Sequence, residues 1–174
     1  TSWEQEKFEV AAHRWVDLTE PGYGVSLLND CKYGHDIKDN TMRISLLRGP
    51  ENPDPTADLG DHEFTYSFYP HPGDWVVAET VQRAAELNTP AIAVPGRTTG
   101  AQEDALAGEN SFASVEGPVI LDTIKPADDG DGWIFRSYEP NGARGTSRIA
   151  FGPTIDSACE VNAVEEHQGE IALA

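Results

Sequence analysis

Ten residues, LLNDCKYGHD from Leu27 to Asp36, place many chemically active side chains directly after an apolar pair. Side chains alternate along an extended segment, so Asp30 and Lys32 are expected to face one way. The opposite side would then carry Asn29, Cys31, Tyr33 and His35. A carboxylate and an ammonium group on one side could bind the hydroxyl groups of a sugar. The simpler alternative is a hairpin end at which Asp30 and Lys32 form a surface ion pair that contributes little.

Two acidic loops are weaker candidates for ligand binding. GPENPDPTADLGD, residues 49–61, is too long for a tight turn, and loops of that length are often functional. Its Asp54 and Asp58 could meet a cation or a sugar, although a solvated loop is the simpler explanation. ADDGDG at 127–132 begins like an EF-hand loop, but Glu139 falls too late to be its last ligand. We therefore expect a turn at 127–132.

Metal and nucleotide motifs are missing from the sequence. The five His residues show no HxH or HExxH spacing, so we expect no metal site made by this chain alone. No GxSxG, P-loop or GxGxxG occurs. Cys31 and Cys159 belong to no CxxC pair, which fits a reducing, cytoplasmic setting. Trp15, Trp75 and Trp133 could stack on sugars, but aromatic residues in strands more often form the core.

Composition narrows the classes of partner. The chain has 174 residues and a net charge of −18, which opposes binding to nucleic acid or to an anionic membrane surface. It has no 18-residue apolar run and no signal-peptide pattern near its start. Because it begins at Thr1, without an initiator Met, we expect it to be a piece of a longer protein.

Strand patterns dominate the first part of the chain. Alternating apolar residues predict strands at 7–18, 24–30, 41–48 and 62–71. The first two would form a hairpin through EPGY, and the last would end at Pro70. A helix is predicted near 75–88, where apolar residues have helical spacing, and AIAV at 91–94 predicts a short strand.

The stretch from Pro95 to Asn110 is small, polar and acidic, which indicates a domain boundary. Beyond it, short strand patterns recur between turns rich in Gly, Asp, Asn and Pro. They lie at 111–115, 119–125, 133–139, 147–152, 158–166 and 170–174. Such regular spacing predicts a small β-sandwich. We therefore expect an all-β chain with one helix.

Several long segments closely resemble the C-terminal region of family 38 glycoside hydrolases, the class II α-mannosidases, in the branch typified by cytosolic and bacterial enzymes. They include FEVAAHRWVDLTEPGYGVSLLNDCKYGHD and RISLLRGPENPDPTADLGDHEFTYSFYPH. SFASVEGPVILDTIKPADDGDGWIFRSYEPNGARGTSRIAF is similar to that family's final small β-domain. The resemblance runs from about Phe8 to Ala172.

This resemblance implies a domain plan. Residues 1–97 would be the last part of a large, galactose-mutarotase-like β-supersandwich, 98–108 a linker, and 109–174 the small terminal β-sandwich. In the intact family, an N-terminal α/β barrel carries the aspartate nucleophile, the acid/base carboxylate and a zinc ion. The barrel is not in this sequence, so the resemblance implies no catalytic residue and no cofactor here, with zinc expected in the parent enzyme.

The resemblance also implies a role for LLNDCKYGHD. It is similar to the family segment that reaches from the β-domain toward the active-site pocket of the barrel. Asp30 and Lys32 match that segment best, whereas Cys31 departs from the basic residue found there. By this likeness Asn29, Asp30, Lys32 and Tyr33 would bind substrate. The implied partners are the barrel of the same polypeptide and a mannose-containing oligosaccharide.

Three hypotheses for function follow. The chain could be the non-catalytic C-terminal part of an α-mannosidase that completes the active-site pocket. It could instead be a free-standing carbohydrate-binding β-sandwich, or a purely structural or oligomerising domain. Because an incomplete sandwich exposes an apolar face or edge, a homo-oligomer is also considered.

Overall fold

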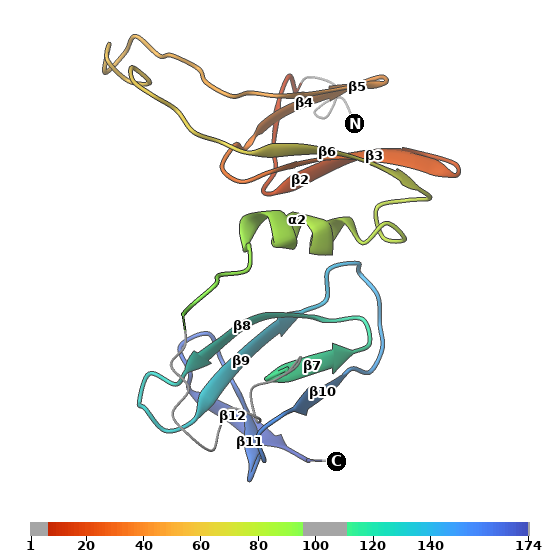
Figure 1. Ribbon diagram of the computed structural model, residues 1–174, viewed down its shortest axis with the longest axis vertical. Coiled ribbons are helices and arrows are strands. Elements are labelled where there is room, and N and C mark those ends of the chain that lie inside the picture. Colours follow the sequence, from red (N-terminus) through yellow and green to blue (C-terminus); the bar gives the residue numbers. More distant parts are fainter. Residues whose placement is uncertain (1–6, 96–110, 174) are drawn as a thin grey trace. The chain divides into compact units, whose positions relative to one another are not determined.

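The computed structural model describes residues 7–95 and 111–173. They fall into two compact units, Thr1–Val94 and Pro95–Ala174, which are drawn in Figure 1. Within the described ranges nearly all regular structure is β, with a single helix in the first unit. The predicted all-β class with one helix is therefore confirmed. The predicted linker at 98–108 lies outside the described residues.

The first unit has three layers. One sheet has the order β1 (Val10–Ala11), β4 (Gly34–Lys38), β5 (Thr41–Ile44), with antiparallel pairs. The second, also antiparallel, has the order β2 (Trp15–Glu20), β3 (Tyr23–Asn29), β6 (Tyr66–Pro72). Helix α2 (Thr80–Asn88) lies against one face of the second sheet, and β4 and β5 lie on its other side (Figure 1).

The predicted first hairpin is present as β2 and β3. Its register pairs Glu20 with Tyr23 across the Pro21-Gly22 turn. Gly22 has φ 87°, a left-handed conformation that Gly adopts without steric cost. The turn therefore sets the register that places every second residue of β3 against the helix.

The predicted continuous strand at 7–18 is in fact broken between Ala11 and Trp15. Arg14 has φ 68°, and the chain crosses at this point from the first sheet to the second. Because both halves keep the same alternation, the sequence pattern gives no sign of the change of sheet.

Three other boundaries differ from the sequence prediction. Strand β6 continues through Pro70 to Pro72, because it lies at a sheet edge where Pro need not donate a hydrogen bond. The helix begins only at Thr80, since the Asp74 carboxylate accepts the N–H groups of Val76 and Val77 and holds a turn there. AIAV at 91–94 forms no strand.

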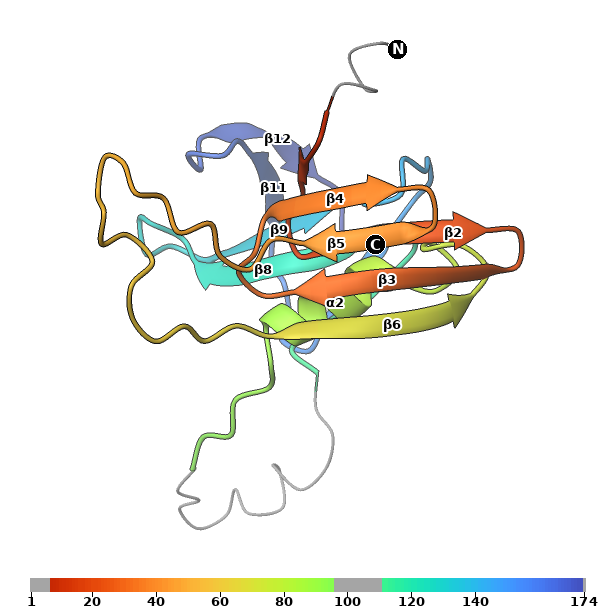
Figure 2. The ribbon, with the colours of Figure 1, turned by 90° about the horizontal axis from the view of Figure 1, so that it is seen from above.

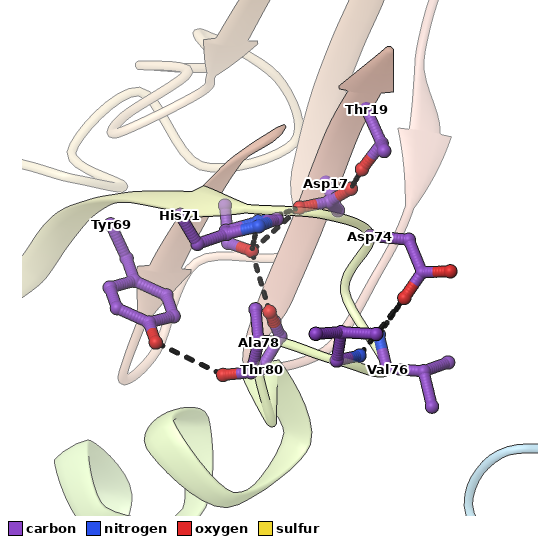
Figure 3. A network of polar contacts seen from close by, with 10 residues as sticks. Asp17, Thr19, Tyr69, His71, Asp74, Val76, Ala78 and Thr80 are labelled. Carbon is purple, nitrogen blue, oxygen red and sulfur yellow. Dashed lines mark hydrogen bonds and ion pairs between the residues drawn. The ribbon is translucent and has the colours of Figure 1, made fainter. Parts of the chain in front are cut away.

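A polar network lies between the second sheet and the helix (Figure 3). Asp17 Oδ2 accepts from the Ser26 hydroxyl at 2.7 Å and lies 2.8 Å from His71 Nε2. Ser26 Oγ is also 2.8 Å from Thr80 Oγ1. Ser26, His71 and Thr80 are buried. Removing one partner of a buried hydrogen bond typically costs about 1–3 kcal/mol, so this network fixes the helix on the sheet.

The second unit consists of paired strands. The pairs are β7 (Ala113–Glu116) with β10 (Arg148–Phe151), β8 (Ile120–Pro126) with β9 (Trp133–Tyr138), and β11 (Ala158–Val161) with β12 (His167–Ile171). The first four strands lie close to their predicted positions, whereas the predicted fifth strand at 158–166 ends at Val161 and the sixth, predicted at 170–174, spans His167–Ile171. The first two pairs meet through aromatic rings, since Phe135 lies 4.4 Å from Phe151 and 6.5 Å from Phe112 between ring centroids.

The acidic loop of the second unit is a turn held by a backbone hydrogen bond and by ion pairs between side chains. ADDGDG closes through a hydrogen bond from the Ala127 N–H to the Gly132 carbonyl, 3.1 Å long. Lys125 Nζ lies 2.5 Å from both Asp128 and Glu165. These hydrogen bonds raise the pKa of Lys125, the one to Asp128 most, and lower the pKa of Glu165. The loop is therefore tied to the turn before β12.

Gly24→Ala should destabilise the first unit. An added Cβ would lie 2.3 Å from His71 Cε1 and 2.8 Å from Thr19 Oγ1, so the network would have to shift. We expect the free energy of unfolding in urea to fall by roughly 1–3 kcal/mol. Gly169→Ala is the matched control, since no heavy atom lies within 4 Å of its added Cβ. Equal stability of the two variants would contradict the close packing of His71 on Gly24.

Candidate functional site

A shallow groove of about 310 Å³ lies on the first unit. It is lined by residues 31–34, by residues 45–48 and by Asp58 and His62 of the long loop. The two motifs that the sequence singles out, LLNDCKYGHD and PDPTAD, therefore meet at one place. The segment after β5 was not predicted to take part.

Asn29, the last residue of β3, holds the loop that enters the groove. Its side chain is buried, with 1% of the residue exposed. The amide oxygen accepts the Lys32 N–H at 2.8 Å, and Nδ2 lies 3.5 Å from His35 Nε2. Its carbonyl accepts from Asn88 at the end of α2. Asn29 therefore fixes the conformation of the loop through hydrogen bonds at its start.

His35 lies on β4, not in an exposed loop, and is fully buried. Its Nδ1 is 3.3 Å from the Tyr33 carbonyl. A neutral ring with its proton on Nδ1 donates to Tyr33 and accepts from Asn29, which satisfies both nitrogens. Burial lowers the pKa of His35. The neutral imidazole thus packs the two sheets together beneath the groove.

Asp30 anchors the loop to the strand segment before β6. Its carboxylate accepts the Thr65 N–H at 2.9 Å, and its own N–H donates to the Thr65 carbonyl at 3.2 Å. A hydrogen bond from the Cys31 thiol, followed by that from Thr65, lowers the pKa of Asp30. The same contact raises the pKa of Cys31, so the exposed thiol is held in its unreactive protonated form.

Lys32 is half-buried and lines the groove. Its ammonium nitrogen lies 4.8 Å from the centre of the Phe64 ring, a cation–π distance. No ion pair joins it to Asp30, so the simpler alternative, a surface pair between them, is not what the structure contains. Within the described part of the chain no carboxylate lies within ion-pair distance of Lys32, which leaves its donors available to a ligand.

Tyr33 projects from the same loop and is 52% exposed. Its ring lies 4.7 Å from that of His13, tilted by 41°. Among the described residues its hydroxyl has no hydrogen-bond partner. An amphipathic ring of this kind can pack on a sugar face and donate one hydrogen bond.

The long loop that closes the groove is shaped by its own acidic residues. Asp58 Oδ2 accepts the Gly49 N–H at 2.8 Å, and His62 Nε2 lies 2.9 Å from the Asp58 carbonyl. Asp54 accepts both the N–H and the hydroxyl of Thr56. Across residues 7–95 and 111–173, no three His, Cys, Asp or Glu side chains group closely enough to hold a metal ion. The two aspartates therefore order the loop.

Comparison with protein families identifies both units. The model of the glycosyl hydrolases family 38 C-terminal domain matches residues 1–56, and that of the family 38 C-terminal beta sandwich domain matches residues 118–174. The chain belongs to the C-terminal region of glycoside hydrolase family 38. The predicted family is thus confirmed, and so is the terminal β-sandwich.

Curated relatives agree with this assignment. Alpha-mannosidase 2C1 of Homo sapiens is 45% identical over 147 residues, which cover 82% of this chain and 14% of the relative. Alpha-mannosidase G of Dictyostelium discoideum is 38% identical over 172 residues, covering 95% of this chain and 16% of the relative. Alpha-mannosidase of Saccharomyces cerevisiae is 51% identical over 88 residues, which cover 51% of this chain and 8% of the relative. The chain thus spans about one seventh of the length of the first of these.

Strand β4 is the main feature that sequence reasoning missed around the groove. GHDIK looked like part of a reactive loop, yet it alternates and is followed by the turn residues Asp39 and Asn40. Asp39 has φ 55°, a conformation that Asp tolerates better than most residues. A hairpin signal was therefore present at 34–44, although the charged residues obscured it.

Protonation of His35 should destabilise the first unit as the pH falls. Its folded pKa lies below the unfolded value of about 6.5, so the unfolded state binds more protons at acidic pH. We expect full stability above about pH 6.5 and a falling free energy of unfolding below it. His35→Gln, which cannot titrate, should show a shallower decline between pH 7 and 5. Parallel profiles for the two proteins in urea unfolding would contradict a buried, neutral His35.

Proposed function

We propose that this chain is the non-catalytic C-terminal part of a retaining α-mannosidase that hydrolyses terminal α-mannosides. On this proposal the groove forms one wall of a sugar-binding pocket whose other walls come from an N-terminal catalytic barrel of the same polypeptide. The supporting observation is Lys32, a half-buried cation that has no carboxylate partner among the described residues and lies on a loop held by hydrogen bonds at Asn29 and Asp30. Mannose is proposed as the sugar because the relatives are named alpha-mannosidases.

The catalytic groups are assigned to the rest of the parent polypeptide. A retaining glycosidase needs two carboxyl groups about 5 Å apart, one as nucleophile and one as acid/base. Asp58, which lines the groove, accepts from the Gly49 backbone, and Asp30, which precedes the lining residues, accepts from the Thr65 backbone, so both carboxylates shape loops. Zinc, which the family likeness implies for the parent, finds no fitting set of ligands in the described part of this chain. We therefore assign no catalytic step to these residues.

The four candidate residues divide into two roles. Lys32 and Tyr33 would contact sugar, the first by donating to hydroxyl oxygens and the second by ring packing and one hydrogen bond. Asn29 and Asp30 would hold the loop in place, since their polar atoms bind the backbone at Lys32 and Thr65. Substrate would thus meet a cation that is positioned before binding. We further propose a cytoplasmic location, in keeping with two exposed, unpaired cysteines.

A carbohydrate-binding role for the terminal sandwich is the second candidate. Trp133 is 55% exposed, and its ring lies 5.4 Å from that of Phe112. Such a pair could serve as a stacking platform for a saccharide independent of any barrel. Its exposed ring distinguishes this candidate from a purely structural domain.

The 174-residue chain alone should not hydrolyse an aryl α-mannoside, with or without added zinc, because residues 7–95 and 111–173 supply no metal site and their groove carboxylates are engaged in shaping loops. Product release is followed by absorbance, alongside calorimetric titration with a mannose oligosaccharide. Turnover that survives repurification would contradict the proposal. Saccharide binding by the chain, abolished by Trp133→Ala, would favour the carbohydrate-binding candidate instead.

Lys32→Met in the parent enzyme should lower kcat/KM while leaving the melting temperature unchanged. Loss of a charged hydrogen bond of about 2–4 kcal/mol corresponds to a reduction on the order of 30-fold to 1000-fold. Lys38→Met, at an exposed position on β4, is the matched control. Activity of Lys32→Met within twofold of the wild type would indicate that the loop is a solvated turn that does not contact substrate. A matching loss of thermal stability would instead indicate a role in holding the fold.

A further inference from the structure

The connection between β9 and β10 contains the only Asn-Gly pair of the sequence, Asn141-Gly142. Residues 139–147 form no regular structure, and this connection can be followed in Figure 2 by its light-blue colour. Both residues of the pair are exposed. Because Gly has no Cβ, the backbone nitrogen that follows Asn141 is open to reaction with the Asn side chain.

One carboxylate holds the backbone on both sides of Gly142. Glu139 Oε1 accepts the Asn141 N–H at 2.9 Å, and Oε2 accepts the Ala143 N–H at 2.9 Å. The N–H between them, that of Gly142, makes no hydrogen bond to another described residue. Glu139 therefore orders the turn and leaves the Gly142 N–H to solvent.

The space around the pair is open as well. Gly142 has φ 70°, which Gly adopts without steric cost. A Cβ added to it would meet no heavy atom within 4 Å, whereas one added to Gly145 would lie 3.2 Å from Pro118 Cγ. Among the described residues the side-chain amide of Asn141 has no hydrogen-bond partner. That amide can therefore rotate toward the Gly142 nitrogen.

Asn162 is the opposite case, although it too lies in a turn. Its Oδ1 accepts the N–H groups of Val164 and Glu166, both at 3.0 Å. Its Nδ2 donates to the Glu166 carboxylate at 2.9 Å. Three hydrogen bonds thus fix the side chain of Asn162, while none fixes that of Asn141.

The other Asn residues of the described ranges each lack one of these conditions. Asn29 and Asn88 are held by hydrogen bonds through their side chains. Asn52 precedes a proline, which has no N–H group. Asn40 precedes a threonine, whose branched Cβ crowds the backbone nitrogen. Sequence and structure therefore select the same position, Asn141.

We propose that Asn141 is a modification site, at which the side-chain amide is converted to a carboxylate without an enzyme. The Gly142 nitrogen loses its proton to hydroxide from solvent and attacks Asn141 Cγ. As the new N–C bond forms, the side-chain nitrogen takes a proton from water and leaves as ammonia. Water then opens the resulting cyclic imide. Opening at the side-chain carbonyl gives Asp, and opening at the main-chain carbonyl gives isoaspartate, in which the main chain runs through the side-chain carbon.

The modification acts on the turn that joins two strand pairs, β8 with β9 and β7 with β10. Either product adds one negative charge to the net charge of −18. Isoaspartate also lengthens the main chain between the two N–H groups that Glu139 binds, so one of these two hydrogen bonds is lost. The turn is consequently loosened by the same reaction that charges it.

Peptide mapping by mass spectrometry follows the 174-residue chain during incubation in neutral buffer. We expect the peptide that contains Asn141 to gain one mass unit and to accept methyl groups from an isoaspartate-specific carboxyl methyltransferase. This reaction should be on the order of tenfold or more faster than at Asn162. Asn141→Gln, whose longer side chain does not form the same ring, should abolish methyl acceptance. Ala163→Gly is the matched control, since it creates a second Asn-Gly pair whose Asn side chain is hydrogen-bonded.

The control and the solvent decide the outcome. Reaction at Asn162 of Ala163→Gly as fast as at Asn141 would show that the residue pair alone sets the rate, and it would overturn the inference. Reaction of Asn141 in urea but not in the folded chain would overturn it too, because the folded turn would then protect the site. Undiminished methyl acceptance by Asn141→Gln would place the isoaspartate elsewhere, as at Asp129-Gly130, and would also contradict the proposal.

Discussion

The first unit depends on one carboxylate placed between its second sheet and its helix. Asp17 of β2 is hydrogen-bonded to Ser26 on β3 and to His71 on β6, and Ser26 continues the network to Thr80 at the start of α2. A carboxylate removed from water is costly unless its oxygens are satisfied, so strands and helix must keep these positions. At the other end of α2, Asn88 donates to the Asn29 carbonyl at 3.1 Å. The helix thus connects the network to the root of the groove loop.

An Asp, a His and a Ser in contact suggest a hydrolytic triad, but their geometry differs from one. In a triad the carboxylate and the hydroxyl bind opposite nitrogens of the imidazole. Here Asp17 and Ser26 both face His71 Nε2, at 2.8 and 3.2 Å, and the buried Nδ1 has no partner. Ser26 is also fully buried, so no substrate reaches its hydroxyl. The network is therefore structural.

Local patterns in the sequence were sufficient for the hairpin of β2 and β3, for a helix within 75–88 and for the first four strands of the terminal unit, because each is set by alternation, spacing and turn residues within a short window. The family resemblance was carried by RWVDLTEPGYG, LLNDCKYGHD and PDPTAD. Features set by contacts distant in sequence were not predictable. The break at Arg14 depends on which sheet each half joins, and the passage of β6 through Pro70 depends on its edge position. The groove itself needs β4 to bring residues 31–34 beside residues 45–48, and the charged side chains of GHDIK concealed that strand.

Both units bury little apolar surface for their content of it. Among hydrophobic residues the described part of the first unit buries only Val16, Leu28, Ala78 and Ala84, and residues 111–173 contain no buried residue. Yet 39% of the chain is hydrophobic. Burial of apolar groups is the main favourable contribution to folding. Exposed side chains such as Phe68 and Trp133 therefore contribute little to the stability of the folded state. The net charge of −18 opposes association of separate copies, so these exposed side chains are not readily covered by a second copy of the chain.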